Sequence, residues 1–561
     1  MISTESEKRK MKKVPLGVEN FVVANELYYV DKTRILKDII DSGLGKTMLF
    51  TRPRRFGKSL ALSMMECFFT DKTDYRHLFE DKEIFRIGER YRLYANAYPV
   101  IRLNMKDVSA PNLSSMLSQS FEIVSSLYRN RAYLFQEDKL FPYERKKFDM
   151  VANRGFEDPF AYTDSIRFLC ELLHRLSGKK VIVLIDEYDT PLENAFQNGF
   201  YDQAVEFFKR LYSNALKAND HILFAVVTGV LQISKESIFS ELNNLNVFNF
   251  MYKGFMPYFG FTKEEVKRLC EHFEVRYDEE MLHHFYGGYG EESCEIYNPW
   301  SILSYIDEER YGSFWVNTGS NKTVQRMLLS NPGNLELLNR ILASERSSFR
   351  YSPTISYEDV SDDANSLLSY LVQCGYLVAT PPTLTGESFL RIPNEEIRLA
   401  FQNEIIGRSS KPTALSLALS FKSALMEGKD QVISDYLRDY VLESFSYYDL
   451  TSEKEYQTML LTLFAVLFEE YVVKSEVNNR FGRCDIMLLP KDKNLSGVII
   501  ELKSYRGRIG KKRLEENANK ALLQIKENQY YSELKRHGCK KNLIYAFCFE
   551  RGNHIILHEE I

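Results

Sequence analysis

The sequence lacks a long apolar run. A membrane span requires roughly 18 apolar residues without interruption, and the nearest approach, Leu460 to Leu467, is closed by Glu469 and Glu470. The N-terminal sequence MISTESEKRKMKK is charged and has no apolar core of the kind found in secretory signals. These absences argue against a membrane protein, and they lead us to expect cytoplasmic residence.

The sequence also lacks paired cysteines and an excess of one charge sign. Its 8 cysteines follow no CxxC or metal-finger spacing, which favours reduced, buried thiols and argues against a zinc site. Lys and Arg number 73 against 77 Asp and Glu, and 27% charged with 44% hydrophobic residues is ordinary globular composition. A length of 561 residues then predicts two or more folded domains.

The first half of the chain, residues 1–260, alternates short apolar runs with helical periodicities. The runs that we expect to form strands cover residues 47–51, 98–102, 180–185 and 222–228. Continuous apolar runs of this length, separated by helices, are typical of buried parallel strands. The fold class we expect is therefore a multidomain α/β protein whose first domain has a parallel sheet.

The second half divides into four further segments. Residues 261–350 become helical from the capping-box sequence Thr262-Lys-Glu-Glu265, which indicates a helical lid. Residues 351–405 show the helix, hairpin, helix outline of a winged-helix module, and such a module either binds nucleic acid or is structural. A helical connector at 406–445 leads to a compact α/β unit at 446–561, with the expected order helix, three strands, helix, strand.

A phosphate-binding loop is indicated directly after the first expected strand. The sequence Arg52-Pro-Arg-Arg-Phe-Gly-Lys-Ser59 leads into a helical run, so its backbone N–H groups and the helix N-terminus offer an anion site with Gly57 at the turn. In such loops the lysine, here Lys58, reaches the β- and γ-phosphates of ATP, and the serine, Ser59, ligates Mg²⁺. Arg52 stands where the motif has its first glycine.

Two other strand ends supply matching polar groups. The run 181–185 delivers Asp186 and Glu187 to the carboxyl edge of the sheet, where open α/β sheets bind ligands. We expect Asp186 to hold the Mg²⁺ shell and Glu187 to polarise the attacking water. Thr228, at the end of the run 222–228, occupies a place where P-loop ATPases have a residue that senses the γ-phosphate, although Thr-Gly is also an ordinary strand exit.

Together these motifs closely resemble the bacterial AAA-ATPase-like family over about residues 10–300. The resemblance is carried by Tyr29-Val-Asp-Lys-Thr33, the loop ending in Ser59, Leu184-Ile-Asp-Glu-Tyr-Asp189, Thr228-Gly229, Ser237-Ile-Phe-Ser240, Leu242-Asn-Asn-Leu245 and Tyr297-Asn-Pro-Trp-Ser-Ile302. Members of this family tolerate Arg at the first position of the loop and usually carry a C-terminal nuclease-like domain. The resemblance therefore implies ATP as ligand and a second active site.

The C-terminal unit contains a candidate metal site. Asp485 begins one expected strand, and Glu501 and Lys503 lie two residues apart, hence on one face of the next. Two carboxylates and a lysine at adjacent strands can bind a divalent ion, Mg²⁺ or Mn²⁺, and stabilise charge on a phosphoryl group. By themselves, Glu501 and Lys503 are equally a surface ion pair on a strand.

This arrangement resembles the PD-(D/E)XK nuclease core. The resemblance implies that Glu455, on the preceding helix, adds to the metal shell, and that Gln524 and Tyr530 correspond to a later Gln/Tyr helix. Their spacing of six residues differs from the four of RecB-like members.

A basic segment follows Lys503. Residues 503–541 contain twelve Lys or Arg against four Glu, which suits binding of a nucleic-acid backbone or a solvated helix face. The favoured function is ATP-regulated, metal-dependent cleavage of DNA, and family analogy suggests a role in defence or mobile-element biology. The alternative is a nucleotide-dependent switch or scaffold whose nuclease-like domain binds without cleaving. The sequence does not indicate the oligomeric state.

Overall fold

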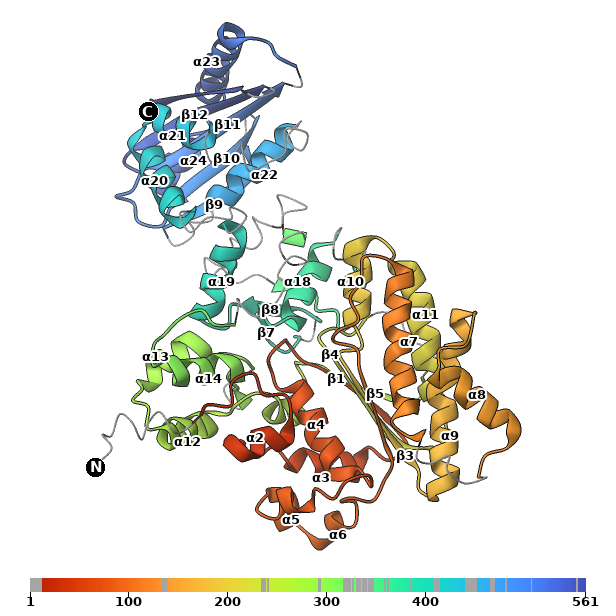
Figure 1. Ribbon diagram of the computed structural model, residues 1–561. Coiled ribbons are helices and arrows are strands. Elements are labelled where there is room, and N and C mark those ends of the chain that lie inside the picture. The colour runs from red at the N-terminus through yellow and green to blue at the C-terminus, as the bar shows by residue number, and fades with distance from the viewer. Residues whose placement is uncertain are drawn as a thin grey trace, which may run out of the picture. The chain divides into compact units, whose positions relative to one another are not determined.

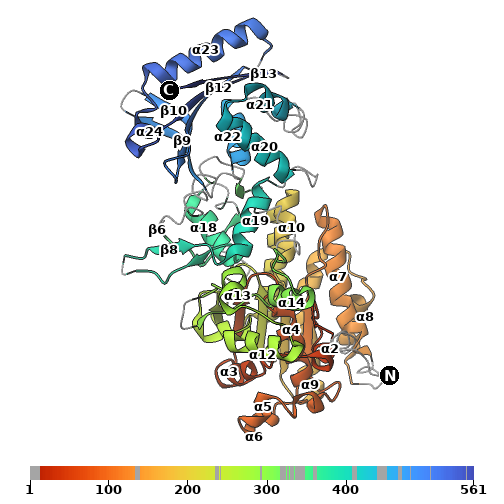
Figure 2. The same ribbon diagram turned by 90° about the vertical axis from the view of Figure 1, so that its left-hand side faces the viewer.

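The computed structural model divides the chain into two compact units, shown in Figures 1 and 2. The first comprises Met1–Gly319, Phe349–Ser388 and Pro393–Glu396, and the second Ser320–Ser348, Phe389–Ile392 and Ile397–Ile561. The structure describes residues 13–132, 139–233, 239, 242–290, 294–315, 324, 327–328, 334, 341, 348–357, 360, 363–383, 385–406, 414–438, 452–464, 470–479, 482–505, 507–550 and 553–561. Apart from Phe239, the motif Ser237-Ile-Phe-Ser240 lies outside these residues.

The first unit is built on a parallel five-stranded sheet with the strand order β2-β3-β4-β1-β5. Its strands are β1 (Thr47–Thr51), β2 (Val100–Asn104), β3 (Val181–Asp186), β4 (Ile222–Gly229) and β5 (Leu245–Phe248). β1 and β3 flank β4, so the carboxyl ends of these three strands meet at one edge of the sheet. The parallel sheet that the sequence predicted is confirmed.

Helices cover both faces of this sheet (Figure 1). Ile182 and Leu184 of β3 face a core that includes the helices α2 to α4, while Val183 and Ile185 alternate to the other face, where α7, α9 and α11 lie. The helices of this part are α2 (Phe21–Leu27), α3 (Arg34–Ser42), α4 (Lys58–Phe69), α5 (Glu83–Arg86), α6 (Glu89–Arg92), α7 (Leu113–Arg129), α8 (Pro142–Ala152), α9 (Ser165–Ser177), α10 (Thr190–Asn198) and α11 (Tyr201–Leu216).

A group of helices follows the sheet in the first unit. They are α12 (Lys263–Phe273), α13 (Glu279–Tyr286) and α14 (Pro299–Glu308), and they share one apolar core. Thr262 caps α12 as the sequence predicted, because its hydroxyl accepts a hydrogen bond from Glu265 N while the Glu265 carboxylate accepts one from Thr262 N.

The segment expected to be winged-helix-like contains α18 (Ala364–Gln373) and short strands. These are β7 (Val378–Ala379) and β8 (Ser388–Arg391), followed by α19 (Glu395–Ile406). β6 (Ser348–Phe349), which precedes the expected segment, pairs with β8 in the strand order β6-β8-β7. Every residue of α18 from Leu367 to Gln373 is buried. This stretch of α18 therefore presents no exposed side chain.

The second unit contains a mixed five-stranded sheet with the order β13-β12-β11-β10-β9. Its strands are β9 (Tyr471–Asn479), β10 (Gly482–Pro490), β11 (Gly497–Tyr505), β12 (Asn542–Glu550) and β13 (Asn553–Glu560), and its helices are α20 (Ala414–Glu427), α21 (Asp430–Tyr436), α22 (Glu453–Leu463), α23 (Lys511–Glu527) and α24 (Ser532–His537). Only β11 and β12 run parallel. The sequence prediction missed β13, the last strand.

The helices also bear on the expectation that the chain does not cross a membrane. In the part of the chain that the structure describes, no helix has the length and apolarity that a bilayer crossing requires.

Candidate nucleotide and nuclease sites

The phosphate loop has the expected strand, loop, helix geometry. β1 ends at Thr51 and α4 begins at Lys58, with Gly57 at the N-cap in the left-handed region, φ 77°. A side chain would strain this backbone, so the glycine is required there. The Lys58 side chain is 4% exposed, and its Nζ donates to the carbonyl oxygens of Arg52 and Pro53, both at 3.0 Å. Burial lowers the pKa of Lys58, and the nearby carboxylate of Glu187 opposes that shift.

Arg52 explains how the loop forms without its first glycine. Its backbone keeps a negative φ, so no glycine is needed. The guanidinium is fully buried, donates to Thr51 O at 2.8 Å and Phe248 O at 2.7 Å, and lies 4.9 Å from the ring of Phe259. Arg52 therefore anchors the start of the loop to the end of β5.

The end of β3 brings the expected carboxylates to the same edge of the sheet. Asp186 is fully buried, and its Oδ1 accepts a hydrogen bond of 2.7 Å from the Thr228 hydroxyl. Its Oδ2 has no hydrogen-bond partner and lies 3.7 Å from the Arg102 guanidinium. Glu187 adopts a left-handed conformation, φ 50°, which is unusual for a residue with a side chain and recurs at functional sites.

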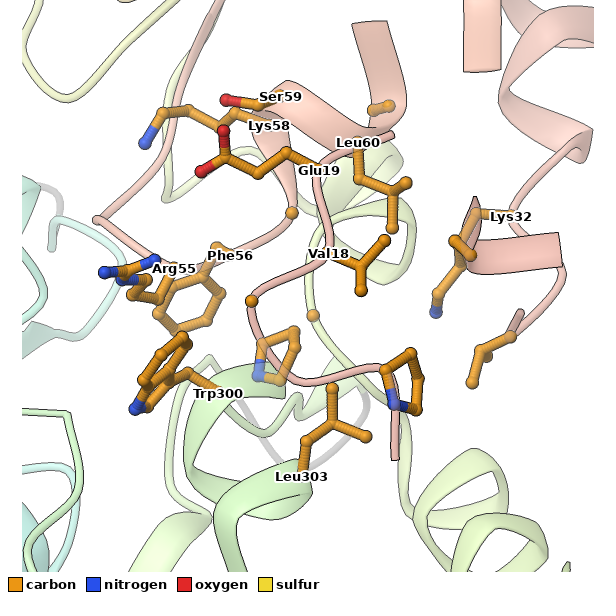
Figure 3. A pocket seen from close by; sticks show the side chains of 18 of the residues that line it. Val18, Glu19, Lys32, Arg55, Phe56, Lys58, Ser59, Leu60, Trp300 and Leu303 are labelled. Carbon is orange, nitrogen blue, oxygen red and sulfur yellow. The ribbon is translucent and has the colours of Figure 1, made fainter. Parts of the chain in front are cut away.

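A cavity of about 360 Å³ opens against the phosphate loop (Figure 3). Gly57, Lys58, Ser59 and Glu187 line it, whereas Asp186 and Thr228 are buried and do not. Five cationic side chains line it: Lys32, Arg54, Arg55, Lys58 and Lys106. Apolar side chains line it as well, including Val18, Leu269, Trp300 and Leu303. A ligand that carries both anionic groups and a flat apolar ring, such as a nucleotide, matches this mixed lining.

Of the two residues expected to hold Mg²⁺, Ser59 lines the cavity, whereas Asp186 is buried and does not line it. The Asp186 Oδ2 atom is a buried carboxylate oxygen without a hydrogen-bond donor, which suits a ligand to a cation or to its water shell. Ser59 lines the cavity at the start of α4. These two residues would hold Mg²⁺, and Lys58 would contact the phosphates.

The sequence reasoning missed Asp189, which organises the strand exits. The Asp189 carboxylate accepts hydrogen bonds from Val230 N at 2.8 Å and Leu231 N at 2.9 Å, just past Thr228. Burial raises the pKa of Asp189 to about 6, and the two N–H donors and Lys58 oppose the shift. Asp189 therefore ties the exit of β4 to the exit of β3. Its position in the run Asp186-Glu-Tyr-Asp189 was the available signal.

In the second unit, adjacent strands bring the candidate nuclease residues together. The antiparallel register that pairs Ile486 with Ile500 places Asp485 beside Glu501. The Asp485 Oδ2 atom accepts a hydrogen bond of 2.7 Å from Leu502 N, which fixes this carboxylate against β11. Lys503 Nζ lies 2.9 Å from Glu501 Oε1. The pair is not a simple surface ion pair, since Glu501 is only 2% exposed.

Glu501 is the centre of the arrangement. Burial and the nearby Asp485 raise the pKa of Glu501 to about 7, while Lys503 opposes the shift. Its Oε1 accepts hydrogen bonds from Lys503 and Gln524, but its Oε2 is buried without a donor. A carboxylate oxygen in that state suits a cation. Among the described residues no group of three or more His, Cys, Asp or Glu is placed to hold a metal ion.

Gln524 and Tyr530 meet despite their spacing of six residues. Gln524 Nε2 donates to Glu501 Oε1 at 2.7 Å and lies 3.5 Å from the Tyr530 hydroxyl, which also accepts from Asn528 at 3.0 Å. α23 ends at Glu527, and the chain turns through Gln529 in a left-handed conformation, which returns Tyr530 toward the helix. Gly482 allows the tyrosine in, because a Cβ there would lie 2.8 Å from its hydroxyl.

A second glutamate of α22, Glu453, lies within electrostatic reach of the site. The Glu455 carboxylate accepts a hydrogen bond of 2.7 Å from Ser452 N and so caps its own helix. Burial raises the pKa of Glu453, with Lys503 lowering it and Asp485 raising it, so these charges lie within electrostatic reach of Glu453. The two glutamates are two residues apart, hence about 200° apart around the helix.

Part of the basic segment lies on the outer face of α23. Lys511, Lys512, Arg513 and Lys520 are exposed, whereas Leu514, Ala518, Ala521 and Ile525 are buried in the core of the unit. The first turn of α23 contains no acidic residue, although helix N-termini favour acidic side chains. Three cations at the positive end of a helix repel one another and would be stabilised by a bound polyanion.

Comparisons with known proteins identify two domains in the chain. Residues 15–239 match the model of a family described as "Predicted AAA-ATPase", and residues 451–559 match the PD-(D/E)XK nuclease superfamily. The chain thus carries an AAA-ATPase-like domain and a C-terminal PD-(D/E)XK nuclease superfamily domain, which confirms the resemblance. It is also 25% identical over 405 residues, 71% of this chain and 70% of the relative, to an "Uncharacterized protein in vnfD 5'region" of Azotobacter chroococcum mcd 1.

Proposed function

We propose that this protein is an ATP-binding and ATP-hydrolysing nuclease that cleaves DNA in a metal-dependent reaction. The observation that supports the cleavage most is the state of Glu501: a buried carboxylate whose Oε1 is held by Lys503 and Gln524 while Oε2 lacks a donor. Such a group is costly to bury unless a cation compensates it.

The residues of the second unit would have separate roles in cleavage. Asp485 and Glu501 would hold a divalent ion, Mg²⁺ or Mn²⁺, which when bound lowers the pKa of water and offsets phosphoryl charge. Lys503 would place its ammonium against the scissile phosphate, and Gln524 would keep Glu501 in one orientation. The exposed cations of α23 would bind the DNA backbone independently of its sequence.

The residues of the first unit would bind and hydrolyse ATP. Lys58 would exchange its two carbonyl partners for phosphate oxygens, which are stronger acceptors because they are charged. Glu187 lines the cavity and would orient the attacking water, while Thr228 would fix Asp186 through their hydrogen bond. Lys58→Ala should lose ATP binding, and Glu187→Gln should bind ATP but turn it over slowly.

A plasmid-nicking assay with Mg²⁺ or Mn²⁺ tests the nuclease. Asp485→Ala, Glu501→Ala and Lys503→Ala should each abolish cleavage without unfolding the unit, and DNA binding should survive Lys503→Ala better than cleavage does. Asn519→Ala is a matched control, since Asn519 is exposed on α23 and bonds only its own helix at Glu515 O. No metal-dependent cleavage by wild type, with DNA binding retained, would favour the scaffold alternative.

We also propose that the nucleotide state regulates cleavage, since an unregulated nuclease would damage the host. Nucleotide can change cleavage only if it binds the active and inactive states with different free energies, and such coupling is usually about 1–3 kcal/mol. Lys58→Ala should then change the cleavage rate by roughly 5- to 150-fold. Equal rates without nucleotide, with ATP and with a non-hydrolysable analogue, in wild type and Lys58→Ala alike, would show that the sites are independent.

A further inference from the structure

The nucleotide cavity contains a cation that the phosphate-loop motif does not supply. Lys106 lies two residues beyond β2 and lines the cavity together with Lys58, Ser59 and Glu187. It is separated from the loop by more than one element of the fold, so no motif containing Gly-Lys-Ser would reveal it.

The position of Lys106 is fixed relative to the acidic end of β3. The parallel register pairs Asn104 with Asp186, and Met105 N donates to Asp186 O at 3.0 Å. The Asn104 side chain then accepts a hydrogen bond of 3.0 Å from Lys106 N, which bends the chain at this point. The lysine therefore leaves the sheet beside Asp186 and Glu187, the residues expected at the terminal phosphate.

The present partner of Lys106 is a carboxylate of the same cavity. Lys106 Nζ lies 2.7 Å from Glu19 Oε1, and their side chains are 42% and 41% exposed. Glu187 also lies close enough to raise the pKa of Lys106, and Arg55 close enough to lower it. Figure 3 shows Glu19 with Lys58 and Ser59 at one end of the cavity, with Lys32 and Leu303 away from them.

The two arginines of the loop that line the cavity, Arg54 and Arg55, already contact other side chains. Arg54 Nη2 lies 2.7 Å from Glu193 on α10, and its carbonyl accepts from the Trp315 indole at 3.1 Å. The Arg55 guanidinium lies over the Trp300 ring at 4.2 Å. An exposed ion pair such as Lys106–Glu19 contributes little to stability, and a phosphate group carries more charge than a carboxylate. An incoming triphosphate can therefore displace Glu19 from Lys106.

We propose that Lys106 contacts the terminal phosphate of a bound nucleoside triphosphate, and that Glu19 occupies this contact when the pocket has no nucleotide. The inference rests on the proposed nucleotide binding. It makes Lys106 a residue that discriminates triphosphate from diphosphate, because only the triphosphate reaches the end of the cavity where Glu187 lies.

Calorimetric titration of the full chain with a non-hydrolysable ATP analogue and with ADP tests the proposal. Lys106→Ala should weaken binding of the analogue about tenfold, the effect of one hydrogen bond between charged groups, and that of ADP by less than about twofold. Lys106→Arg should retain most of the discrimination. Glu19→Gln, which removes the competitor, should tighten binding of the analogue more than that of ADP. Lys179→Ala is the charge-matched control, because Lys179 is exposed and does not line the cavity.

The outcomes separate this inference from the proposed function. If wild type binds both ligands, Lys58→Ala abolishes binding, and Lys106→Ala lowers both affinities equally or neither, then Lys106 has no terminal-phosphate contact and only the inference fails. If wild type binds neither ligand, both the proposed nucleotide binding and the inference about Lys106 fail. If thermal unfolding shows that Lys106→Ala does not fold, the ratio of the affinities for the ATP analogue and for ADP is measured in Lys106→Arg and Glu19→Gln instead. A ratio in Glu19→Gln that is unchanged from wild type would overturn the assignment.

Discussion

The amide nitrogen of Gln524 donates a hydrogen bond of 2.7 Å to Oε1 of Glu501. The same oxygen accepts from Lys503, so Gln524 helps to leave Oε2 as the oxygen without a donor. A side chain that fixes the orientation of a metal ligand typically affects metal affinity or activity by about 10- to 100-fold when removed. We therefore expect Gln524 to act as a positioning residue for the proposed metal site.

We expect Gln524→Ala to lower Mn²⁺ affinity and cleavage together by about 10- to 100-fold while the unit stays folded. Calorimetry with Mn²⁺ and the nicking assay measure both quantities, and Asn519→Ala on the same helix is the control. Wild-type Mn²⁺ affinity in Gln524→Ala would show that the hydrogen bond does not orient a metal ligand.

The pKa of Glu501 predicts a pH dependence of metal binding. Burial and Asp485 raise this pKa from 4.5 to about 7, so the folded protein retains a proton that the unfolded chain loses between these values. The stability of the second unit should therefore fall as pH rises from about 4.5 to 7. Because a metal binds the ionised carboxylate, Mn²⁺ affinity should rise about fivefold between pH 6 and 7 and level off above about 8.

Lys503 provides the check on that assignment. Lys503 lowers the pKa of Glu501, so Lys503→Met should move the midpoint of the Mn²⁺ affinity profile to higher pH. A midpoint unchanged by Lys503→Met, or an affinity that does not vary between about pH 6 and 8, would mean that Glu501 does not control metal binding.

The two glutamates at the start of α22 make a matched pair of variants. Glu453 lies within electrostatic reach of Asp485 and Lys503, whereas Glu455 caps the helix through Ser452 N. Glu453→Ala should lower cleavage about tenfold or more with little loss of stability. Glu455→Ala should instead lower the free energy of unfolding by about 1 kcal/mol and leave cleavage near the wild-type rate. Nicking assays and thermal unfolding of both variants measure cleavage and stability. The reverse pattern would assign Glu455, and not Glu453, to the nuclease site.

These glutamates also show where sequence reasoning stops. The strand, loop and helix around Lys58 were predictable because the motif is local, and Asp485, Glu501 and Lys503 because strand periodicity fixes their faces. Which face of α22 packs toward β11 depends on tertiary contacts that no local pattern encodes. The sequence Ser452-Glu-Lys-Glu455 did carry a readable capping-box signal, and it would have assigned Glu455 to the helix end.

Strand edges were harder to predict than strand centres. β5 is short, contains Asn246 and is only half-buried, so it lacks the continuous apolar run of β1, β3 and β4. β13 begins and ends with exposed polar residues, and it is recognised mainly through its antiparallel pairing with β12. The contact between Gln524 and Tyr530 depends on the left-handed turn at Gln529, and a glutamine does not predict that backbone conformation.

Arg52 gives the last prediction, because the loop motif and the structure disagree about it. The motif would have glycine here, yet the Arg52 backbone does not need one, and its buried guanidinium bonds two carbonyls and stacks on Phe259. Arg52→Gly would leave a cavity and remove the guanidinium hydrogen bonds to two carbonyl oxygens, and it would loosen the segment whose carbonyl receives Lys58. Two nitrogens of the Arg52 guanidinium are buried without a hydrogen-bond partner. Removing this buried charge therefore offsets part of the stability that the substitution costs.

We expect the loss to prevail, with Arg52→Gly lowering the free energy of unfolding of the first unit by about 3 kcal/mol. ATP affinity should fall as well, because the loop would be less ordered before it binds. Arg52→Met separates the two causes, because it fills the volume without the hydrogen bonds, and a loss of only about 1 kcal/mol would show that the cavity costs more stability than the lost hydrogen bonds do. Thermal unfolding and ATP titration of both variants measure these effects. An Arg52→Gly protein that is as stable as wild type and binds ATP more tightly would show that the buried arginine is not the anchor of the loop.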